Sequence, residues 1–329
     1  MTALAPTLQA FFTDWLLRQR QASPATVTAY RDTFRLLLRF VADQACKPPS
    51  AIGIEDLDAH TIAAFLDHLE ADRHNSARTR NARLAAIRSL FHYAAVRHPE
   101  HAAVIARVLA IPQKRFDKAT VSYLTHTEVD VLLDAPDIDQ WEGRRDRALL
   151  AVAVQTGLRV TELCSLDCGD VTLDAGAHLR CEGKGRKQRA VPLTATTVAV
   201  LRAWLRELGG LPGEPLFPTR TGRRLTRGAL ERRITAHAVV AAQRCPSMRD
   251  KTITPHVLRH TAAMALLHAG VDIAVIALWL GHEDIRSTQM YLHADLAIKE
   301  RALALVTPNG AKPGRYRPPD PLLAFLESL

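Results

Sequence analysis

Hydrophobic residues in the first 110 positions recur every three or four residues, which is the spacing of helices with one apolar face. Four such segments are present, and the first of them covers residues 8–16. The second follows Ser23 and Pro24, a residue pair typical of a helix N-terminus. The third covers residues 54–69, and the fourth begins at Ser76. The pattern predicts a small bundle of four helices joined by short loops.

The helical spacing stops at residues 111–124, where charged residues and a proline predict a linker. Thr125 and Glu128 then have the spacing of a capping box, so a second domain should begin near them. The predicted division is a first domain at 1–110, a linker at 111–124, a second domain at 125–306 and a tail at 307–329. The tail begins with a segment rich in Pro and Gly and ends with an apolar stripe, which comprises Leu322, Phe325, Leu326 and Leu329.

The second domain begins with helical patterns and then changes to the shorter spacing of strands. An apolar helix at residues 147–155 is followed by Gly157, a typical helix C-terminus. Two strand-like segments, at 178–182 and 188–193, flank the basic run 183–187, which predicts a β-hairpin with a basic tip. Helices resume after Thr194. The predicted fold class is mainly α, with a small β-sheet in the second domain.

The composition is that of an ordinary globular protein, with 47% hydrophobic and 23% charged residues. A net charge of +9 and a pI of about 9.6 favour an anionic partner such as nucleic acid, although many proteins of this charge bind no anion. The five scattered cysteines indicate a reducing compartment without a disulfide framework. Because no signal peptide and no membrane-spanning stretch is evident, we expect a cytoplasmic protein.

Two helices of the first domain carry basic residues on the face opposite the apolar stripe. The helix after Ser23 presents Thr28, Arg31 and Arg35. The helix after Ser76 presents four arginines, Arg78, Arg80, Arg83 and Arg88. Such residues are often only solvated surface, but two basic helices in one small domain favour contact with DNA.

The second domain contains an ordered set of residues suited to phosphoryl transfer. A phenol, here Tyr291, can attack a phosphodiester when cations neutralise the charge that develops and histidines handle protons. Arg159 and Arg259 would each bind a non-bridging phosphate oxygen, and Glu162, three residues after Arg159, would hold that arginine in place. We expect the hydroxyl of Tyr291 to be accessible, because the segment around it is short and polar.

The remaining candidates would move protons. Lys184, between two glycines at the hairpin tip, can protonate the leaving 5′-oxygen, and Lys187 is the weaker candidate. His256 could accept the tyrosine proton, and His282 could donate to the phosphate. His260 should pack in the core. His256 and His260 have a zinc-compatible spacing, but the glutamate of a zinc-protease helix is missing, so we expect no metal and no cofactor.

Four motifs resemble the tyrosine recombinases, also called phage integrases, and among them the Xer-type bacterial members. The motifs are TGLRVTELCSL at 156–166, GKGRKQRAVPL at 183–193, TPHVLRHTAA at 254–263 and LGHEDIRSTQMY at 280–291. The resemblance implies a helical, SAM-like N-terminal DNA-binding domain and a mixed α/β catalytic domain that clamp DNA from two sides. The family pattern carries over to the six candidates Arg159, Lys184, His256, Arg259, His282 and the nucleophile Tyr291.

The resemblance also implies the reaction and the partners. The enzyme would cleave a double-stranded DNA recombination site to a 3′-phosphotyrosine and a free 5′-hydroxyl. Two pairs of protomers, in a homo-tetramer or in a hetero-tetramer with a related recombinase, would exchange strands through a Holliday junction. A type IB topoisomerase shares this chemistry and is one alternative. The other is an inactive DNA-binding accessory factor of a mobile element, which the complete set of six argues against. The family often ends soon after a helix that follows the tyrosine, so the added tail favours a mobile element and leaves open whether the tail docks on its own protomer or on a neighbour.

Overall fold

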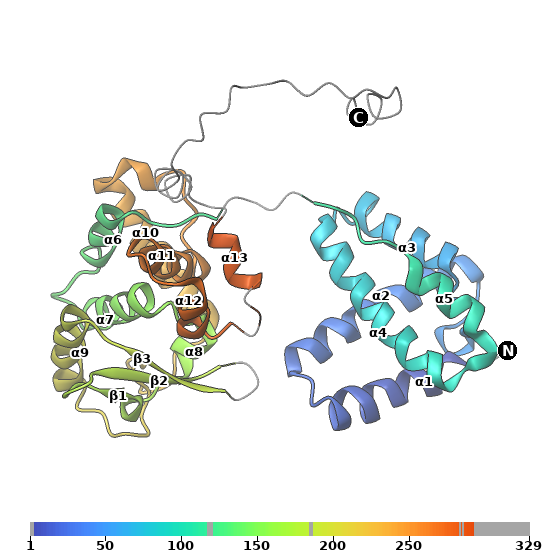
Figure 1. Ribbon diagram of the computed structural model, residues 1–329, viewed down its shortest axis with the longest axis horizontal. Helices are drawn as coiled ribbons and strands as arrows, with labels where there is room; N and C mark the ends of the chain where they lie inside the picture. The colour runs from blue at the N-terminus through green and yellow to red at the C-terminus, as the bar shows by residue number, and fades with distance from the viewer. Residues whose placement is uncertain (1–2, 117–120, 184–186, 283, 285, 293–329) are drawn as a thin grey trace, which may run out of the picture. The chain divides into compact units, whose positions relative to one another are not determined.

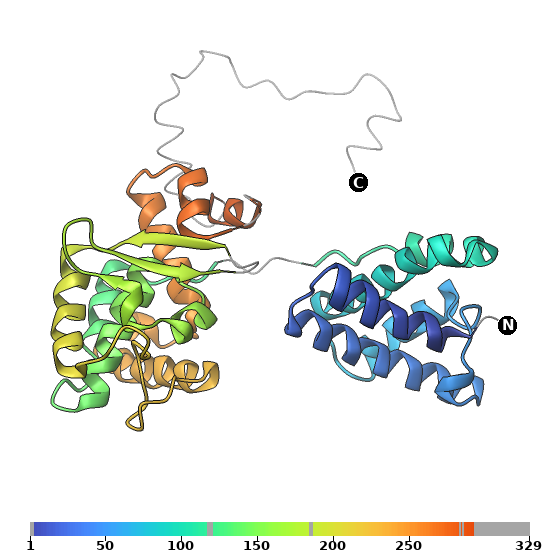
Figure 2. The same cartoon turned by 90° about the horizontal axis from the view of Figure 1, so that it is seen from below.

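The chain forms two compact units, Met1–Ala119 and Thr120–Leu329, each with its own hydrophobic core (Figures 1 and 2). The structure, a computed structural model, describes residues 3–116, 121–183, 187–282, 284 and 286–292. The division between the units lies inside the segment predicted as a linker. The predicted tail at 307–329 and the hairpin tip with Lys184 lie outside the described residues.

The first unit is helical. Its helices are α1 (Leu4–Ala10), which continues as a π-helical segment (Phe11–Gln19), α2 (Pro24–Ala45), α3 (Ala59–Ala71), α4 (Ala77–Arg97) and α5 (Ala102–Ala110), with short 3₁₀ turns at Pro49–Ala51 and Pro99–His101. Ser23 and Ser76 cap α2 and α4, as predicted, by accepting backbone N–H groups through their hydroxyls. The sequence pattern missed α5, whose Ile105 and Val108 are buried in the core.

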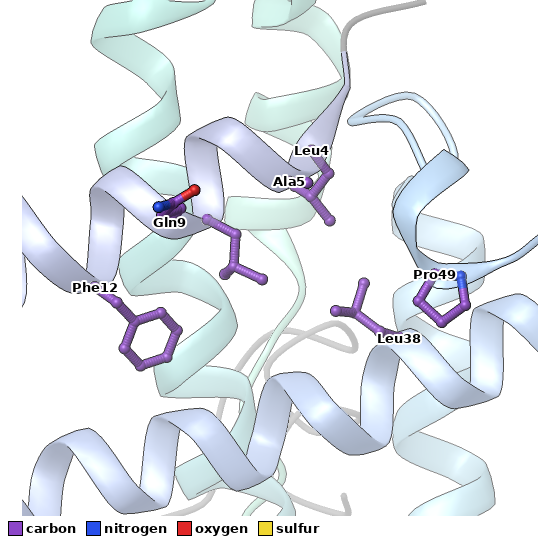
Figure 3. A pocket seen from close by; sticks show the side chains of 7 residues that line it. Leu4, Ala5, Gln9, Phe12, Leu38 and Pro49 are labelled. Carbon is purple, nitrogen blue, oxygen red and sulfur yellow. The ribbon is translucent and has the colours of Figure 1, made fainter.

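Phe11 lies at the centre of the first core and is fully buried. Its ring contacts five other aromatic rings, those of Phe12, Trp15, Tyr30, Phe34 and Tyr93. Aromatic side chains bury large areas with defined edge and stacking geometry, so this cluster fixes the first helical segment against α2 and α4. A small, mainly apolar pocket near the start of α1 is lined by Leu4, Ala5, Leu8, Gln9, Phe12, Leu38 and Pro49 (Figure 3).

The second unit combines helices with a small sheet at one edge (Figures 1 and 2). Its elements are α6 (His126–Leu133), α7 (Trp141–Thr156), α8 (Val160–Ser165), β1 (Val171–Thr172), β2 (His178–Glu182), β3 (Gln188–Pro192), α9 (Ala195–Leu208), α10 (Arg227–Arg244), α11 (Pro255–His268), α12 (Ile273–Leu280) and α13 (Arg286–Leu292), with 3₁₀ turns at Cys168–Asp170 and Pro246–Met248. The sheet is antiparallel in the order β1-β2-β3, and Cys181 pairs with Arg189 across the hairpin. The predicted fold class is confirmed.

Local sequence signals set the ends of these elements as predicted. Thr125 and Glu128 form a capping box at the start of α6. Gly157 ends α7 with a φ of 64°, a left-handed conformation that glycine adopts without strain. Thr194 caps α9. Among the described helices, none combines the length and the apolar character that a membrane crossing requires.

A buried ionic network joins α7 to α10 in the second core. Arg145 is fully buried and donates two hydrogen bonds to Asp146 Oδ1, through Nε at 3.0 Å and Nη2 at 2.7 Å. Its Nη1 donates to the Pro218 carbonyl at 2.8 Å. The other oxygen of Asp146 contacts Arg233 Nη1 at 3.0 Å and His237 Nε2 at 2.9 Å. Asp146 therefore neutralises a cation that has no access to water.

Replacing Asp146 with alanine should destabilise the second unit by about 3–5 kcal/mol, because it leaves the Arg145 guanidinium buried without its counter-ion. Urea unfolding of the full chain, followed by tryptophan fluorescence, measures the change. Asp130→Ala, which removes an exposed carboxylate from α6, is the matched control and should shift the free energy of unfolding by no more than about 0.5 kcal/mol. Equal effects of the two substitutions would contradict this role of Asp146.

Candidate active site

Three arginines converge on the turn that ends α12. The turn begins at Gly281, whose φ is 66°, and the carbonyls of Ala277 and Leu278 accept the N–H groups of the residues in the turn. The next three carbonyls accept from arginine side chains: Trp279 from Arg189 at 3.1 Å, Leu280 from Arg259 at 2.8 Å and Gly281 from Arg159 at 2.9 Å. The carbonyl end of a helix carries partial negative charge, so it attracts and orients these cations.

Arg159 lies at the N-terminus of α8 and is held by Glu162, as the sequence predicts. Its backbone N–H donates to Glu162 Oε2 at 2.8 Å, and its Nη1 donates to Oε1 at 3.0 Å. Arg189 on β3 also binds this carboxylate through both Nη atoms. Burial opposes ionisation of Glu162, but hydrogen bonds from Arg189 and from the Arg159 backbone outweigh it and lower the pKa of the carboxyl. The contact made by Arg189 was not predicted.

Arg259 is a buried cation. It lies on α11, its residue is only 4% exposed, and its guanidinium donates to the carbonyls of Gly157 and Leu280. Burial, with a smaller contribution from the charge of Arg159, lowers its pKa to about 10, so it remains charged at neutral pH. Within the described part of the chain, no carboxylate forms an ion pair with it. A buried charge held only by carbonyl dipoles favours a bound anion.

Tyr291 on α13 is buried, with 1% of its surface exposed. It belongs to an apolar cluster with Ala263, Met264, Ile276 and Leu280. The expectation of an accessible hydroxyl is therefore wrong for this structure, because α13 packs against α11 and α12 and turns the ring toward them. Burial raises the pKa of the phenol, although the charges of two nearby arginines oppose the shift.

The histidines differ from the predicted arrangement. The Nδ1 atom of His260 lies 3.0 Å from the Tyr291 hydroxyl, so His260 contacts the tyrosine instead of packing in the core alone. His256 is exposed, and its ring stacks on that of His260 at 6.4 Å between centroids. His282 is half-buried, and its Nδ1 lies 2.6 Å from the hydroxyl of fully buried Thr288.

The hairpin tip that would carry Lys184 lies outside the described residues, so its role stays a prediction. The flanking strands are in place, and the Gly183 N–H donates to the Lys187 carbonyl at 2.8 Å. Lys187 is exposed. The described residues contain no cluster of His, Cys, Asp or Glu that could hold a metal ion.

The predicted basic face of the first unit holds in part. Thr28, Arg31 and Arg35 are exposed on α2, and Arg78 is exposed on α4. Arg80 is not on this face, because it is 6% exposed and its Nε lies 3.4 Å from Glu70.

Two further residues of α4 are half-buried. Arg88 donates to the Ile111 carbonyl and so holds the start of the linker. Burial lowers the pKa of Arg83, and the charge of Arg73, a residue that the sequence interpretation missed, adds to the shift. Arg83 and Arg73 therefore lie close enough for their charges to repel.

Comparison with known proteins gives the family. Residues 122–297 match the phage integrase family, and residues 9–98 match the phage integrase N-terminal SAM-like domain. The chain therefore belongs to the phage integrase family, and it is a site-specific tyrosine recombinase with Xer-like relatives. The two alternatives, a topoisomerase and an inactive accessory factor, are not favoured.

Two similar proteins extend along nearly the whole chain. An integrase/recombinase named y4rC from Sinorhizobium fredii is 53% identical over 327 residues, covering 99% of this chain and 98% of that protein. The tyrosine recombinase XerD of Pseudomonas putida is 34% identical over 317 residues, covering 94% and 100%. The fold resembles that of the XerH site-specific recombinase bound to a difH substrate after cleavage, with a TM-score of 0.67 and 23% identity over 87% of this chain and 81% of that one.

The lowered pKa values of two histidines in this site predict that the free energy of unfolding depends on pH. Burial, with contributions from nearby charges, lowers the pKa of both His260 and His282 to about 4. An unfolded histidine has a pKa of about 6.5, so between about pH 6.5 and pH 4 the unfolded chain binds protons that the folded chain does not. Stability should therefore fall as the pH falls through this range.

Replacing His282 with asparagine should reduce the loss of stability between about pH 7 and about pH 5, because the substitution removes one of the two histidines whose pKa is lowered in the folded protein. Urea unfolding at the two pH values measures this difference. His126→Asn, which changes an exposed histidine on α6, should leave the difference as in the wild type. If His282→Asn retains the full pH dependence, His282 does not titrate as described.

Proposed function

We propose that Tyr291 is the nucleophile of this recombinase and that Arg159 and Arg259 hold the scissile phosphate. The observation that carries the proposal is the buried guanidinium of Arg259, held by two helix-end carbonyls and without a carboxylate partner among the described residues. Arg159 is anchored on the adjacent carbonyl and is more exposed. Two guanidiniums fixed side by side can neutralise the charge that develops on a phosphorane.

The proposed reaction forms a bond between the Tyr291 oxygen and phosphorus while the bond from phosphorus to the 5′-oxygen breaks. His260 is the group nearest the phenol, and its Nδ1 can accept the proton when Nε2 carries the other one. His256, stacked on His260 and exposed, is the second candidate. Lys184 would give a proton to the leaving oxygen, and His282 would donate to the phosphate. The phosphotyrosine conserves the bond energy, so rejoining needs no nucleotide cofactor.

The buried position of Tyr291 implies a change before cleavage. The Tyr291 ring is packed in an apolar cluster and its hydroxyl lies against His260, so α13 would shift relative to α11 and α12 to bring the hydroxyl to a phosphate on a DNA duplex. Of the described elements, α13 is short and comes last in the chain. A resting state of this kind would protect DNA from cleavage by a protomer that is not correctly assembled.

The first unit is proposed to bind DNA through the exposed residues of α2 and α4. Arg31 and Arg35 are exposed, and their only carboxylate neighbour among the described residues, Asp32, is shared between them. Arg78 on α4 is also exposed, and half-buried Arg83 of the same helix lies near the charges of both Arg73 and Asp32. DNA phosphate groups would neutralise the exposed guanidiniums of Arg31, Arg35 and Arg78.

The partners are proposed to be a double-stranded recombination site and three further recombinase protomers. A solved λ integrase tetramer is bound to a Holliday junction and shares the fold, with a TM-score of 0.63 at 18% identity. Sinorhizobium fredii has a second relative, y4rD, 42% identical over 263 residues, which supports a pair of related recombinases in one cell. The reaction would take place in the cytoplasm, and tail docking stays a prediction for residues outside the described set.

Tyr291→Phe should abolish the covalent adduct with DNA while DNA binding is retained, because only the attacking oxygen is removed. The substrate is a nicked suicide duplex of the site recovered by sequencing DNA trapped on the wild-type protein, and the adduct is detected on denaturing gels. Tyr123→Phe is the control and should still form the adduct, since it leaves the Tyr291 hydroxyl in place and keeps the Tyr123 backbone carbonyl that accepts from the Lys251 side chain. An adduct that survives Tyr291→Phe would disprove the assignment.

Arg31→Ala with Arg35→Ala should weaken DNA binding uniformly across sequences and lower the slope of log K against log salt by about 1 for each phosphate left without its arginine. Fluorescence anisotropy over a range of salt concentrations measures both quantities. Arg107→Ala, on the exposed side of α5, is the control and should change neither. An unchanged slope in the double variant would show that Arg31 and Arg35 do not contact DNA phosphates.

A further inference from the structure

The buried carboxylate of Glu162 is shared by two arginines in different ways. Arg189 binds both of its oxygens, with Nη1 at 3.0 Å from Oε1 and Nη2 at 2.8 Å from Oε2. Arg159 makes a single side-chain bond, from Nη1 to Oε1 at 3.0 Å. The Glu162 side chain is 3% exposed, so it needs a cationic partner in the folded protein. The two-point contact makes Arg189 its principal counter-ion.

Arg159 keeps donors available as a result. A guanidinium has five N–H groups, and among the described residues Arg159 uses one for Glu162 and one for the Gly281 carbonyl. Its side chain is 30% exposed, whereas that of Arg189 is 13% exposed. Arg159 is thus the member of the pair that a phosphate can reach.

Arg189 is itself fixed from several directions. Its Nε donates to the Trp279 carbonyl at 3.1 Å, and on β3 its backbone pairs with Cys181 of β2. It also lies directly against Gly281, where an added Cβ would come within 2.7 Å of its Nη1. Gly281 has a positive φ, so glycine suits the turn both for its backbone conformation and for the close approach of the guanidinium.

We propose that Arg189 is a positioning residue for the cleavage reaction, which neutralises Glu162 so that Arg159 stays free to bind the scissile phosphate. The proposal rests on the phosphate-binding role of Arg159 given above. Without Arg189, the buried carboxylate would have Arg159 as its one remaining ion-pair partner among the described residues and would draw that guanidinium into a two-point contact. Arg159 would then be a poor phosphate ligand. The side-chain hydrogen bonds of Arg189 within the described residues go to Glu162 and to the Trp279 carbonyl, so it would act through Glu162 and Arg159.

Arg189→Met removes the charge and keeps most of the apolar stem. Glu162→Gln removes the carboxylate charge, while the amide oxygen can still accept the Arg159 backbone N–H. The double variant therefore leaves no uncompensated buried charge. Arg180→Met on β2 is the matched control, because Arg180 is exposed and donates to the Gly169 carbonyl instead. Single-turnover cleavage is measured as total cleaved strand, on duplexes with either a phosphodiester or a neutral methylphosphonate at the scissile position.

Arg189→Met should slow cleavage of the phosphodiester by about a hundredfold, the effect of losing one charge-stabilising donor. The same substitution made in the Glu162→Gln background should change the rate by less than about threefold, because the competing carboxylate is gone. On the methylphosphonate, which has no negative charge for Arg159 to neutralise, the defect of Arg189→Met should shrink. Arg180→Met should cleave both duplexes at the wild-type rate.

Two results would overturn the proposal. One is wild-type cleavage by Arg189→Met. The other is a defect that is equally large in the Glu162→Gln background and on the methylphosphonate, which would mark Arg189 as a residue needed only for folding. Thermal unfolding by circular dichroism accompanies each variant, and the comparison in the Glu162→Gln background remains decisive if Arg189→Met alone does not fold. If the wild-type protein forms no adduct, the proposed function has failed instead.

Discussion

The candidate active site depends on the carbonyl end of α12. A helix leaves its last carbonyls without partners inside the helix, and they must be satisfied elsewhere when they are buried. Here the glycine turn satisfies two of them, and the side chains of Arg189, Arg259 and Arg159 satisfy the next three in order. One short backbone segment therefore fixes cations from a strand, from α11 and from the N-terminus of α8. Glu162 also brings Arg159 and Arg189 together, and the carbonyl of Leu280 adds Arg259 to them.

Charge balance then determines what the site can bind. Glu162 is the buried carboxylate of the group, and it accepts hydrogen bonds from Arg159 and Arg189. Arg259 remains with carbonyl partners, and the low polarity of its surroundings lowers its pKa to about 10. The arginines together carry more positive charge than Glu162 can offset, which supports the proposal that an anion binds there. Tyr291 lies in the neighbouring apolar cluster, where burial raises the pKa of the phenol.

Short-range features of the fold could be predicted from the sequence because they depend on neighbouring residues. The caps at Ser23, Ser76 and Thr194, the glycine at 157 and the β-hairpin are of this kind. The family motifs similarly carried the candidate catalytic residues, whose individual roles stay predictions.

Features that depend on packing between distant segments could not be predicted. Arg80 and Arg88 were predicted to lie on one exposed face with Arg78, but Arg80 is buried near Glu70 and Arg88 is half-buried against the Ile111 carbonyl. The burial of Tyr291 follows from contacts of α13 with α11 and α12, and Arg189 reaches Glu162 from a different element. Arg189 lies in the motif at 183–193, so the sequence shows a basic residue at this position. Nothing in the sequence indicated that Glu162 would be its partner.

The most direct test of the account is a crystal structure of the protein on a nicked recombination site, with Tyr291 replaced by phenylalanine to stop the reaction. The account predicts that the two non-bridging oxygens of the scissile phosphate lie within hydrogen-bond distance of Arg159 and Arg259. Both arginines should keep their bonds to the carbonyls of Gly281 and Leu280. A scissile phosphate bound elsewhere, with neither guanidinium in contact with it, would contradict the account.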